Sequence, residues 1–298
     1  MIRYFVARGE TARLDDEARA TLRGSFVELA DGVTHYELTG PDGGELVVLI
    51  PGITIPLFYW DEVAERLHAD GFRTLAFSAY GRGYSDRVRA TYDESLFVGQ
   101  LEQLIAALGL AGPGHIVGTS MGALVAIASV LSDPGSARTL TLIGPAGLSN
   151  QPPALIRRSG GGALTALIGR YGGRRGLLGH LAHNVDDARD AEALRKMVTD
   201  SYRYEGSMYA LFSTVIEFPL TDRRALYRDV ARHQVPTLLL WGENDRVTPI
   251  ASMPEARALL GRDIATAVVA DSGHMAPLEQ PAAVAELLAA FISDIDGS

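Results

Sequence analysis

The chain has 298 residues, of which 47% are hydrophobic and 21% are charged, a balance typical of a globular protein with a sizeable core. It carries 27 basic and 36 acidic residues, so its formal charge of -9 argues against nucleic acid or an anionic membrane surface as a main partner. The absence of cysteine excludes disulfides, thiolate metal sites and cysteine nucleophiles.

The amino-terminal residues contain no apolar segment as long as that of a signal peptide, and no run of about 18 apolar residues occurs anywhere in the chain. We therefore expect no stable membrane insertion, and a cytoplasmic location is the default expectation. Residues 1–25 are rich in charge and are predicted to form an amino-terminal extension, with a short helix between Asp15 and Arg23.

Three strands are predicted next, within "SFVELADGVTHYELTGPDGGELVVLIPG", because turn residues separate its apolar runs. The third strand, Leu46 to Ile50, is continuously apolar, as strands are when helices cover both faces of a sheet. Strand and helix patterns then alternate. The expected elements are helix 60–69, strand 73–77, helix 92–108, strand 115–117, helix 121–131, strand 139–143, strand 237–241, helix 252–260, strand 264–270 and helix 282–292.

This alternation predicts an α/β fold with a mostly parallel, doubly wound sheet. Residues 147–232 interrupt the alternation, because they contain no convincing strand and combine a glycine-rich, basic stretch with helical patterns. We therefore predict a core formed by residues 26–146 and 233–298, with residues 147–232 as a helical cap over the carboxyl edge of the sheet.

The stretch Gly118-Thr119-Ser120-Met121-Gly122 matches G-x-S-x-G at the boundary between a predicted strand and a predicted helix. A serine on such a sharp turn has a strained backbone, the flanking glycines relieve the crowding, and the hydroxyl projects above the sheet. The N–H of Met121 at the start of the helix is placed to hold an oxyanion. A glycine-rich turn with a surface serine would produce the same pattern, so the motif alone leaves both interpretations open.

Two later loops supply the other residue types of a serine hydrolase. "WGENDRVTP" places Asp245 directly after a buried strand, and "VADSGHMAPLEQP" places His274 after the next one. The chain order Ser, Asp, His is that of α/β-hydrolases and differs from the order in other triad folds. Each of the three residues follows a predicted parallel strand, where such sheets hold their sites.

With these residues the chain resembles an α/β-hydrolase-fold serine hydrolase of the single-domain esterase and lipase type, over about residues 26–293. The resemblance rests on "GTSMG", "WGENDRVTP", "DSGHMAPLEQP" and "YGRGYSD". It implies Ser120 as nucleophile, His274 as general base and acid, and Asp245 as the residue that orients His274. Glu243 and Asp271 are the weaker candidates for the acid.

The sequence departs from the family pattern in two places. Pro51-Gly52 stands where the family usually has His-Gly. Because the oxyanion donor from this loop is a backbone N–H, we assign it to Ile53, with the N–H of Met121 as the second donor. Ser78 replaces the usual Asp at the start of "SAYGRGYSD", a position whose role in the family is structural.

The resemblance implies a serine hydrolase that cleaves a carboxylic ester with an apolar acyl or alcohol part, through an acyl-enzyme on Ser120. No cofactor and no metal are expected, and the expected partner is a small-molecule ester. Two alternatives remain open: the same triad acting on a C–C, amide or thioester bond, and a hydrolase-fold ligand-binding protein with little turnover. The sequence does not specify the oligomeric state.

Three groups in the predicted cap have two interpretations each. His180 and His183, with Asp187 one turn later, have the spacing of metal ligands, but a solvated helix face explains them. The apolar residues 208–212 could form an acyl pocket or anchor the cap. The arginines could meet an anionic substrate or line a solvated face. These are Arg157, Arg158, Arg174 and Arg175.

Overall fold

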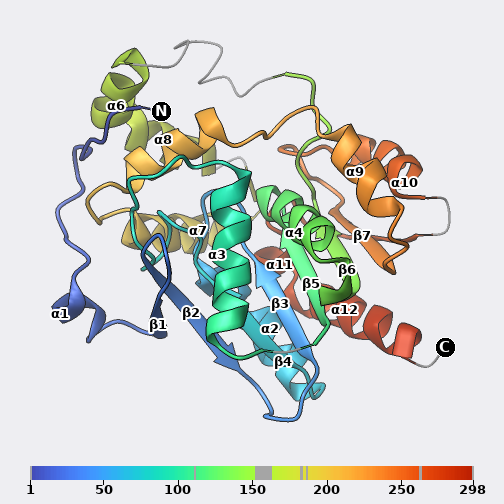
Figure 1. The fold of residues 1–298 in the computed structure, drawn as a ribbon. Coiled ribbons are helices and arrows are strands. Elements are labelled where there is room, and N and C mark those ends of the chain that lie inside the picture. Colours follow the sequence, from blue (N-terminus) through green and yellow to red (C-terminus); the bar gives the residue numbers. More distant parts are fainter. Residues whose placement is uncertain are drawn as a thin grey trace.

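An eight-stranded sheet runs through the centre of the computed structural model (Figure 1), which describes residues 2–110, 112–151, 163–181, 184–185, 187–261 and 264–296. The strands are β1 (Ser25–Glu28), β2 (Val33–Thr39), β3 (Leu46–Ile50), β4 (Arg73–Phe77), β5 (Gly114–Thr119), β6 (Ala137–Ile143), β7 (Thr237–Gly242) and β8 (Ala265–Val269). The helices are α1 (Asp16–Arg19), α2 (Asp61–Ala69), α3 (Glu94–Ala107), α4 (Met121–Ser132), α6 (Ala163–Leu181), α7 (Ala188–Ser201), α8 (Ser207–Glu217), α9 (Arg224–Ala231), α10 (Met253–Leu260), α11 (Ala276–Glu279) and α12 (Pro281–Asp296). Short 3-10 helices are η1 (Leu57–Trp60), η2 (Pro134–Ser136) and η3 (Ile250–Ser252).

The strand order is β1-β2-β4-β3-β5-β6-β7-β8. β1 and β2 are antiparallel to their neighbours, and all pairs from β4 to β8 are parallel. Helices α2 and α12 pack together on one face, while α3, α4, α9 and α10 form a contiguous layer on the other. The predicted α/β fold with a mostly parallel, doubly wound sheet is confirmed, and the apolar run of β3 is buried as expected.

The register of the parallel strands brings their carboxyl ends to one edge of the sheet. Ile50 at the end of β3 pairs with Gly118, and Thr119 at the end of β5 pairs with Ile143 at the end of β6. Ile143 in turn pairs with Leu240 of β7. The loops that follow these strands therefore emerge side by side, and they include the motifs singled out in the sequence.

Helices α6, α7 and α8 lie between β6 and β7 in the chain, and no strand occurs in the described part of residues 147–232. α6 packs against α8. A Cβ atom on Gly169 would lie 2.5 Å from Cζ of Phe5, and one on Gly173 would lie 2.9 Å from Cε of Met208. Glycine therefore permits the close packing of this face of α6. None of the helices within the described ranges is both long and apolar enough to cross a membrane.

The amino-terminal residues pack against these helices. Ile2 and Phe5 are buried, and the Phe5 ring lies 6.3 Å from that of Phe212 in α8. The carboxylate of Glu10 accepts hydrogen bonds from the N–H groups of Gly206 (2.9 Å) and Met208 (2.6 Å), so it caps the start of α8.

α1 is shorter than the helix predicted to extend to Arg23. The hydroxyl of Thr21 donates a hydrogen bond to the carbonyl of Ala18 at 2.9 Å. A threonine side chain that bonds nearby carbonyls in this way competes with helix continuation.

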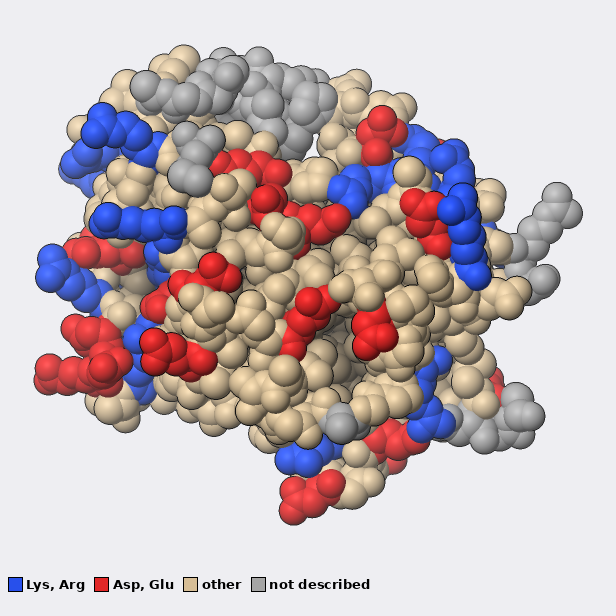
Figure 2. All heavy atoms as spheres, in the orientation of Figure 1, with Lys and Arg blue, Asp and Glu red and all other residues tan. Residues whose placement is uncertain are grey.

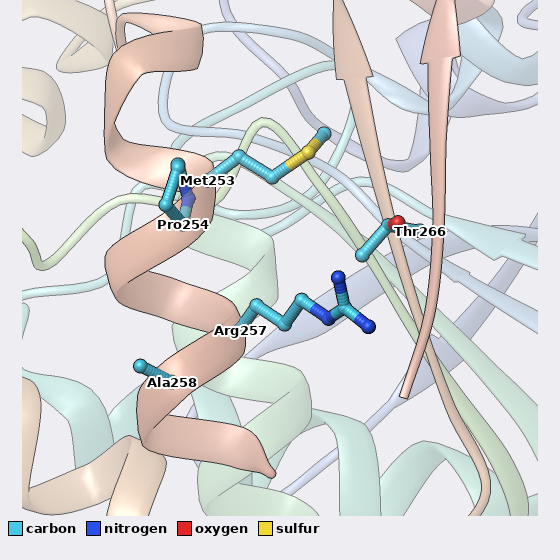
Figure 3. A pocket seen from close by; sticks show the side chains of 5 residues that line it. All are labelled: Met253, Pro254, Arg257, Ala258 and Thr266. Carbon is cyan, nitrogen blue, oxygen red and sulfur yellow. The ribbon is translucent and has the colours of Figure 1, made fainter. Parts of the chain in front are cut away.

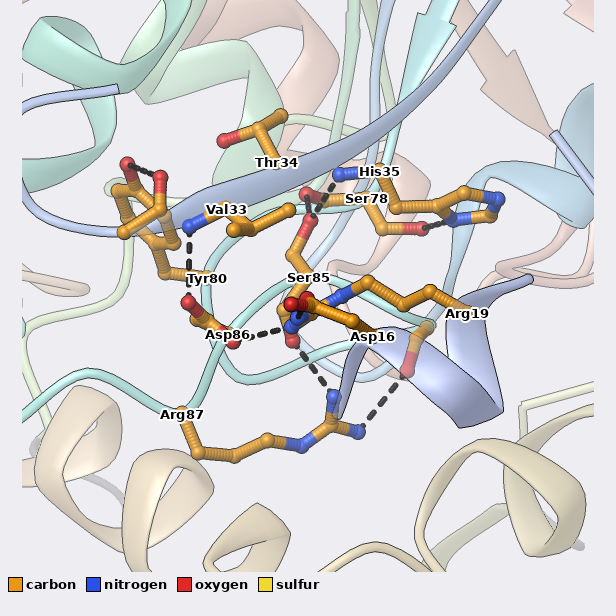
Figure 4. A network of polar contacts seen from close by, with 12 residues as sticks. Asp16, Arg19, Val33, Thr34, His35, Ser78, Tyr80, Ser85, Asp86 and Arg87 are labelled. Carbon is orange, nitrogen blue, oxygen red and sulfur yellow. Dashed lines mark hydrogen bonds and ion pairs between the residues drawn. The ribbon is translucent and has the colours of Figure 1, made fainter. Parts of the chain in front are cut away.

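A buried polar network fixes the loop after β4 (Figure 4). The N–H of His35 donates to Oγ of Ser85 (2.9 Å), which donates to the carbonyl of Ser78 (2.6 Å). Oγ of Ser78 accepts the N–H of Leu57 at the start of η1 (3.1 Å). Ser78 therefore joins β2, the loop after β4 and the loop after β3, which is a structural role.

His35 is neutral within this network. Its Nε2 lies 2.9 Å from the carbonyl of Arg23, which can only accept, so Nε2 carries the proton. Its Nδ1 then accepts from the hydroxyl of Ser78 at 3.1 Å. Burial lowers the pKa of His35 to about 4, because an imidazolium there would lose its hydration.

The folded protein should lose stability as the pH falls from about 6.5 to about 4. In this range the unfolded chain binds a proton at His35 and the folded chain does not, so acid favours unfolding, by about 3 kcal/mol in total. Urea unfolding at pH 7 and pH 4.5 should show a larger loss in the wild type than in His35→Gln. Equal losses would mean that His35 is protonated in the folded state.

Candidate active site

Ser120 occupies a strained turn between β5 and α4. Its φ is 54° and its ψ is -117°, a conformation that costs a residue with a side chain about 1–3 kcal/mol. Its N–H donates to the carbonyl of Ile143 (2.9 Å), and its carbonyl accepts from the N–H groups of Ala123 and Ala146, both at 3.2 Å. The turn is therefore held by the start of α4 and by the loop after β6.

The two glycines that flank Ser120 allow backbone segments to approach closely. A Cβ atom on Gly118 would lie 2.3 Å from the carbonyl oxygen of Gly122. A Cβ atom on Gly122 would lie 2.5 Å from the carbonyl oxygens of both Ile50 and Pro51. No side chain fits in either place, so the glycines of G-x-S-x-G are required by backbone packing.

Asp245 and His274 form a buried hydrogen-bonded pair. Nδ1 of His274 lies 2.8 Å from Oδ2 of Asp245, and the side chains are 4% and 1% exposed. The carboxylate also accepts the N–H groups of Val247 (2.8 Å) and Thr248 (2.9 Å) at Oδ1. Because the carboxylate accepts from Nδ1, neutral His274 carries its proton there and leaves Nε2 as an acceptor.

Thr248 supports this pair and was not singled out from the sequence. Its hydroxyl lies 2.8 Å from Oδ2 of Asp245, 3.0 Å from the carbonyl of Gly144 and 3.3 Å from Nδ1 of His274. Its own carbonyl accepts from Nε1 of Trp241 at 2.6 Å. The signal in the sequence was a threonine three residues after the aspartate, a spacing at which an aspartate commonly accepts backbone N–H groups.

The backbone of His274 is held by a segment far away in the chain. Its N–H donates to the carbonyl of Asn184, between α6 and α7, at 3.0 Å. The preceding N–H, of Gly273, donates to the carboxylate of Glu279 in α11 at 3.0 Å. Asn184 was not predicted from the sequence, because the residues around it give no sign of a contact with His274, 90 positions later in the chain.

The end of β6 brings the Asp245–His274 pair close to the turn at Ser120. Ile143 accepts the N–H of Ser120, and the next residue, Gly144, has a φ of 46°. A Cβ atom on Gly144 would lie 3.0 Å from Oδ2 of Asp245 and 3.5 Å from Nδ1 of His274. Ser120 and the Asp245–His274 pair therefore lie at the same edge of the sheet. Ile143 contacts the serine, and the next residue, Gly144, lies beside the pair.

The backbone groups expected to form an oxyanion hole flank the same turn. A Cβ atom on Gly52, which precedes Ile53, would lie 3.4 Å from Cβ of Ser120. Met121 is the first residue of α4, so its N–H has no acceptor within the helix. The loop after β3 and the start of α4 thus both border Ser120.

Arg82 holds the loop after β3 by a hydrogen bond to the backbone of that loop. It is fully buried, and its Nε donates to the carbonyl of Ile53 at 2.7 Å. Its terminal nitrogens donate to the carbonyl of Tyr80 (2.9 Å) and to Oγ1 of Thr214 in α8 (2.8 Å). No carboxylate forms an ion pair with Arg82 among the described residues, and burial lowers the pKa of this guanidinium. The arginine thus joins Ile53 to α8.

The other carboxylates considered for the acid lie elsewhere. Glu243 and Asp271 are exposed, and the Glu243 carboxylate accepts the N–H of Asp271 at 3.3 Å. The apolar residues 208–212 are all buried, and α8, which carries them, packs against α6. No cluster of three metal-ligand side chains occurs within the described ranges, and His183, Arg157 and Arg158 lie outside them.

A cavity of about 500 Å³ lies between α10 and β8 (Figure 3). Its lining residues are Met253, Pro254, Arg257, Ala258 and Thr266. None of them belongs to the loops around Ser120 or His274, so this cavity is not part of the candidate site.

Comparisons with known proteins identify relatives for most of the chain. A sequence model described as the alpha/beta hydrolase family matches residues 47–287. Monoacylglycerol lipase abhd6-B of Xenopus laevis is 25% identical over 229 residues, which are 72% of this chain and 66% of that protein, so the chain spans slightly less than two thirds of that relative. A 2-hydroxymuconate semialdehyde hydrolase of Pseudomonas putida is 27% identical over 227 residues, which are 75% of this chain and 78% of that protein. A thermophilic esterase of Thermogutta terrifontis has a similar fold, with a TM-score of 0.77, 21% identity and coverage of 91% of this chain and 99% of the esterase.

Gly122→Ala should destabilise the protein strongly, because the new methyl group would meet two backbone carbonyl oxygens that cannot rotate away. We expect a loss of about 3 kcal/mol, the upper end of the usual cost of overpacking a core. Gly99→Ala, inside α3 with only the Gln103 amide within 4 Å of the new atom, is the matched control and should be neutral or stabilising by up to about 1 kcal/mol. Urea unfolding of both variants tests this, and a stable Gly122→Ala would contradict it.

Proposed function

We propose that this chain, which belongs to the alpha/beta hydrolase family, is a serine hydrolase that cleaves a carboxylic ester through an acyl-enzyme on Ser120. The observation that carries the proposal is the buried hydrogen bond between His274 and Asp245 at the same sheet edge as the strained turn of Ser120. A serine, a histidine and a buried carboxylate with these relations are the components of nucleophilic acyl transfer.

In the proposed reaction Nε2 of His274 takes the proton of the Ser120 hydroxyl while Oγ attacks the ester carbonyl. The tetrahedral oxyanion accepts hydrogen bonds from the N–H groups of Ile53 and Met121. The imidazolium then gives its proton to the departing alkoxide, and the acyl group stays on Ser120. A water molecule, deprotonated by His274, repeats the sequence and releases the acid. Asp245 stabilises the imidazolium throughout.

An ester with an apolar acyl or alcohol part is the favoured substrate class. Support comes from the relatives named monoacylglycerol lipase and from the esterase of similar fold. The semialdehyde hydrolase relative favours C–C bond cleavage by the same triad as the second candidate. Turnover of p-nitrophenyl esters of increasing chain length, compared with a meta-cleavage dienoate and an aryl amide, decides between them, and preferential turnover of the dienoate would replace the ester proposal.

A fluorophosphonate probe should label the protein once, at Ser120. The probe reacts only with a hydroxyl whose proton a neighbouring base removes, so Ser120→Ala should abolish both labelling and turnover. Ser95→Ala, an exposed serine at the start of α3, is the control and should leave both unchanged. Labelling that persists in Ser120→Ala would assign the nucleophile to another residue.

Asp245→Asn should lower kcat by roughly 10⁴, because the amide no longer favours the histidine tautomer with its proton on Nδ1. The fold should persist, since the side chain keeps its size. Asp271→Asn is the same change on an exposed aspartate and should keep normal kcat. A normal kcat in Asp245→Asn together with a large loss of kcat in Asp271→Asn would assign the role of the triad acid to Asp271.

Arg82 should act as a positioning residue for the oxyanion hole. Arg82→Met removes the bond to the carbonyl of Ile53, and we expect kcat to fall by about tenfold to a hundredfold, less than the loss of one complete oxyanion donor. Fluorophosphonate labelling should slow in proportion, while the Nδ1 proton of His274 keeps its NMR resonance.

Arg87→Met is the matched control for this experiment. Arg87 is partly buried and donates to the carbonyls of Ser85, Gly83 and Ser201, none of which belongs to the loop after β3. Equal losses of kcat in the two variants at equal thermal stability would show that Arg82 has only a general structural role.

A further inference from the structure

Helix α6 presents an exposed apolar stripe that the proposed reaction does not use. Leu164, Leu167, Ile168 and Tyr171 are 53%, 56%, 37% and 67% exposed, and we call these four residues the α6 stripe. Their spacing of three and four residues places them on one face of the helix. Within the described residues, the other large hydrophobic side chains that are exposed to this degree are Tyr4 and Val268.

The α6 stripe points away from the protein because the opposite face of α6 is already packed. Thr165 and Leu177 are buried on that face, and Gly169 and Gly173 approach Phe5 and the side chains of α8. The helix therefore cannot turn its apolar side chains inward without losing this contact. Contiguous apolar side chains on the surface of a soluble protein mark a binding surface.

The charge around the α6 stripe has the opposite sign to that of the chain. Helix α6 itself carries three arginines, Arg170, Arg174 and Arg175, and no aspartate or glutamate, although the whole chain carries a net charge of -9. Figure 2 shows basic side chains at the upper left, where Figure 1 places α6. Arg170 and Arg175 are exposed, and the Arg170 guanidinium lies 5.9 Å from the centre of the Tyr171 ring; no ion pair is seen for either arginine among the described residues. Arg175 follows Tyr171 by one turn on the same face.

This combination of apolar side chains and arginines fits an anionic lipid surface. Apolar side chains enter the boundary between headgroups and acyl chains, while the long stems of arginine let the guanidinium remain at the lipid phosphates. A second copy of the chain fits poorly, because two such stripes would bring arginines together with no carboxylate between them. A nucleic acid would pair with the arginines but leave the aliphatic side chains without a partner.

We propose that α6 is a peripheral docking surface for anionic lipid, in which the α6 stripe enters the headgroup boundary of one leaflet and Arg170 and Arg175 bind lipid phosphates. The acidic remainder of the protein stays in water and keeps the orientation of the bound molecule fixed, because a negatively charged surface is repelled by the same lipid. This docking is independent of the proposed hydrolytic reaction.

The test uses the full chain with Ser120→Ala, so that lipid hydrolysis cannot alter the vesicles. Co-sedimentation is measured with vesicles of phosphatidylcholine alone and of phosphatidylcholine with about one third phosphatidylglycerol, at low and high salt. We expect binding to the mixed vesicles and weaker binding at high salt, since screening reduces attraction between exposed charges.

Two sets of substitutions separate the apolar and the electrostatic contributions. Leu167→Ser, Ile168→Ser and Tyr171→Ser combined should reduce vesicle binding by at least about tenfold. Arg170→Gln with Arg175→Gln should remove the preference for vesicles that contain phosphatidylglycerol. We expect each arginine to contribute about a fivefold increase in binding to these vesicles. Val268→Ser, an exposed apolar residue on the edge strand β8, is the control and should bind as the parent does.

The side chains altered on α6 and β8 are all exposed, so the substitutions should leave the fold intact. Thermal unfolding of each variant, compared with the parent, checks this. Absence of binding to the mixed vesicles, or equal binding by the triple serine variant and its parent, overturns the proposal. A dimer in sedimentation equilibrium that the triple substitution dissociates, without vesicle binding, would assign the α6 stripe to a second copy of the chain instead.

Discussion

The architecture of the candidate site depends on one close approach of backbone to backbone. The start of α4 lies so near the end of β3 that a methyl group on Gly122 would stand 2.5 Å from two carbonyl oxygens. Beside this approach the chain passes from β5 to α4 in a sharp turn, with a φ of 54° at Ser120. The close approach also places the loop after β3 beside the serine, so one packing constraint sets the position of the candidate nucleophile and of a candidate oxyanion donor. The strain at Ser120 persists because hydrogen bonds to Ile143, Ala123 and Ala146 hold the turn on both sides.

The Asp245–His274 pair is fixed by a second set of contacts, which is polar. Backbone N–H groups and the hydroxyl of Thr248 surround the carboxylate, and the histidine backbone is bonded to Asn184. A buried carboxylate needs such partners, since an unpaired charge away from water is costly. The segment that carries Asn184 belongs to the helices between β6 and β7. The geometry of the histidine therefore depends on those helices as well as on the sheet.

The helices between β6 and β7 are joined to the core by buried charged side chains. Arg82 connects α8 to the loop that contains Ile53, and Glu10 caps the start of α8 from the amino-terminal residues. Buried polar contacts of this kind define one arrangement, because each unsatisfied alternative leaves a charged group without a partner. Apolar contacts alone, such as those of Phe5 with Phe212, would tolerate sliding. In the same arrangement the apolar side chains on the outer face of α6 are exposed.

The sequence by itself determined the elements and the chemistry that local patterns encode. Apolar runs and turn residues predicted the strands, and β3 was predicted with its observed bounds, because burial on both faces leaves a continuous apolar signature. The glycines around Ser120 and the loop positions of Asp245 and His274 were also visible, since each motif is contiguous in the chain. What the tertiary structure decided are contacts between residues distant in sequence: the antiparallel pairing of β2 with β4, the burial of the amino-terminal residues against α8, the bond from Arg82 to Ile53 and the support of His274 by Asn184. A residue such as Arg82 or Asn184 has the same appearance in a sequence whether it is solvated or buried. Only the folded chain brings its partners within hydrogen-bonding distance and so gives it a role.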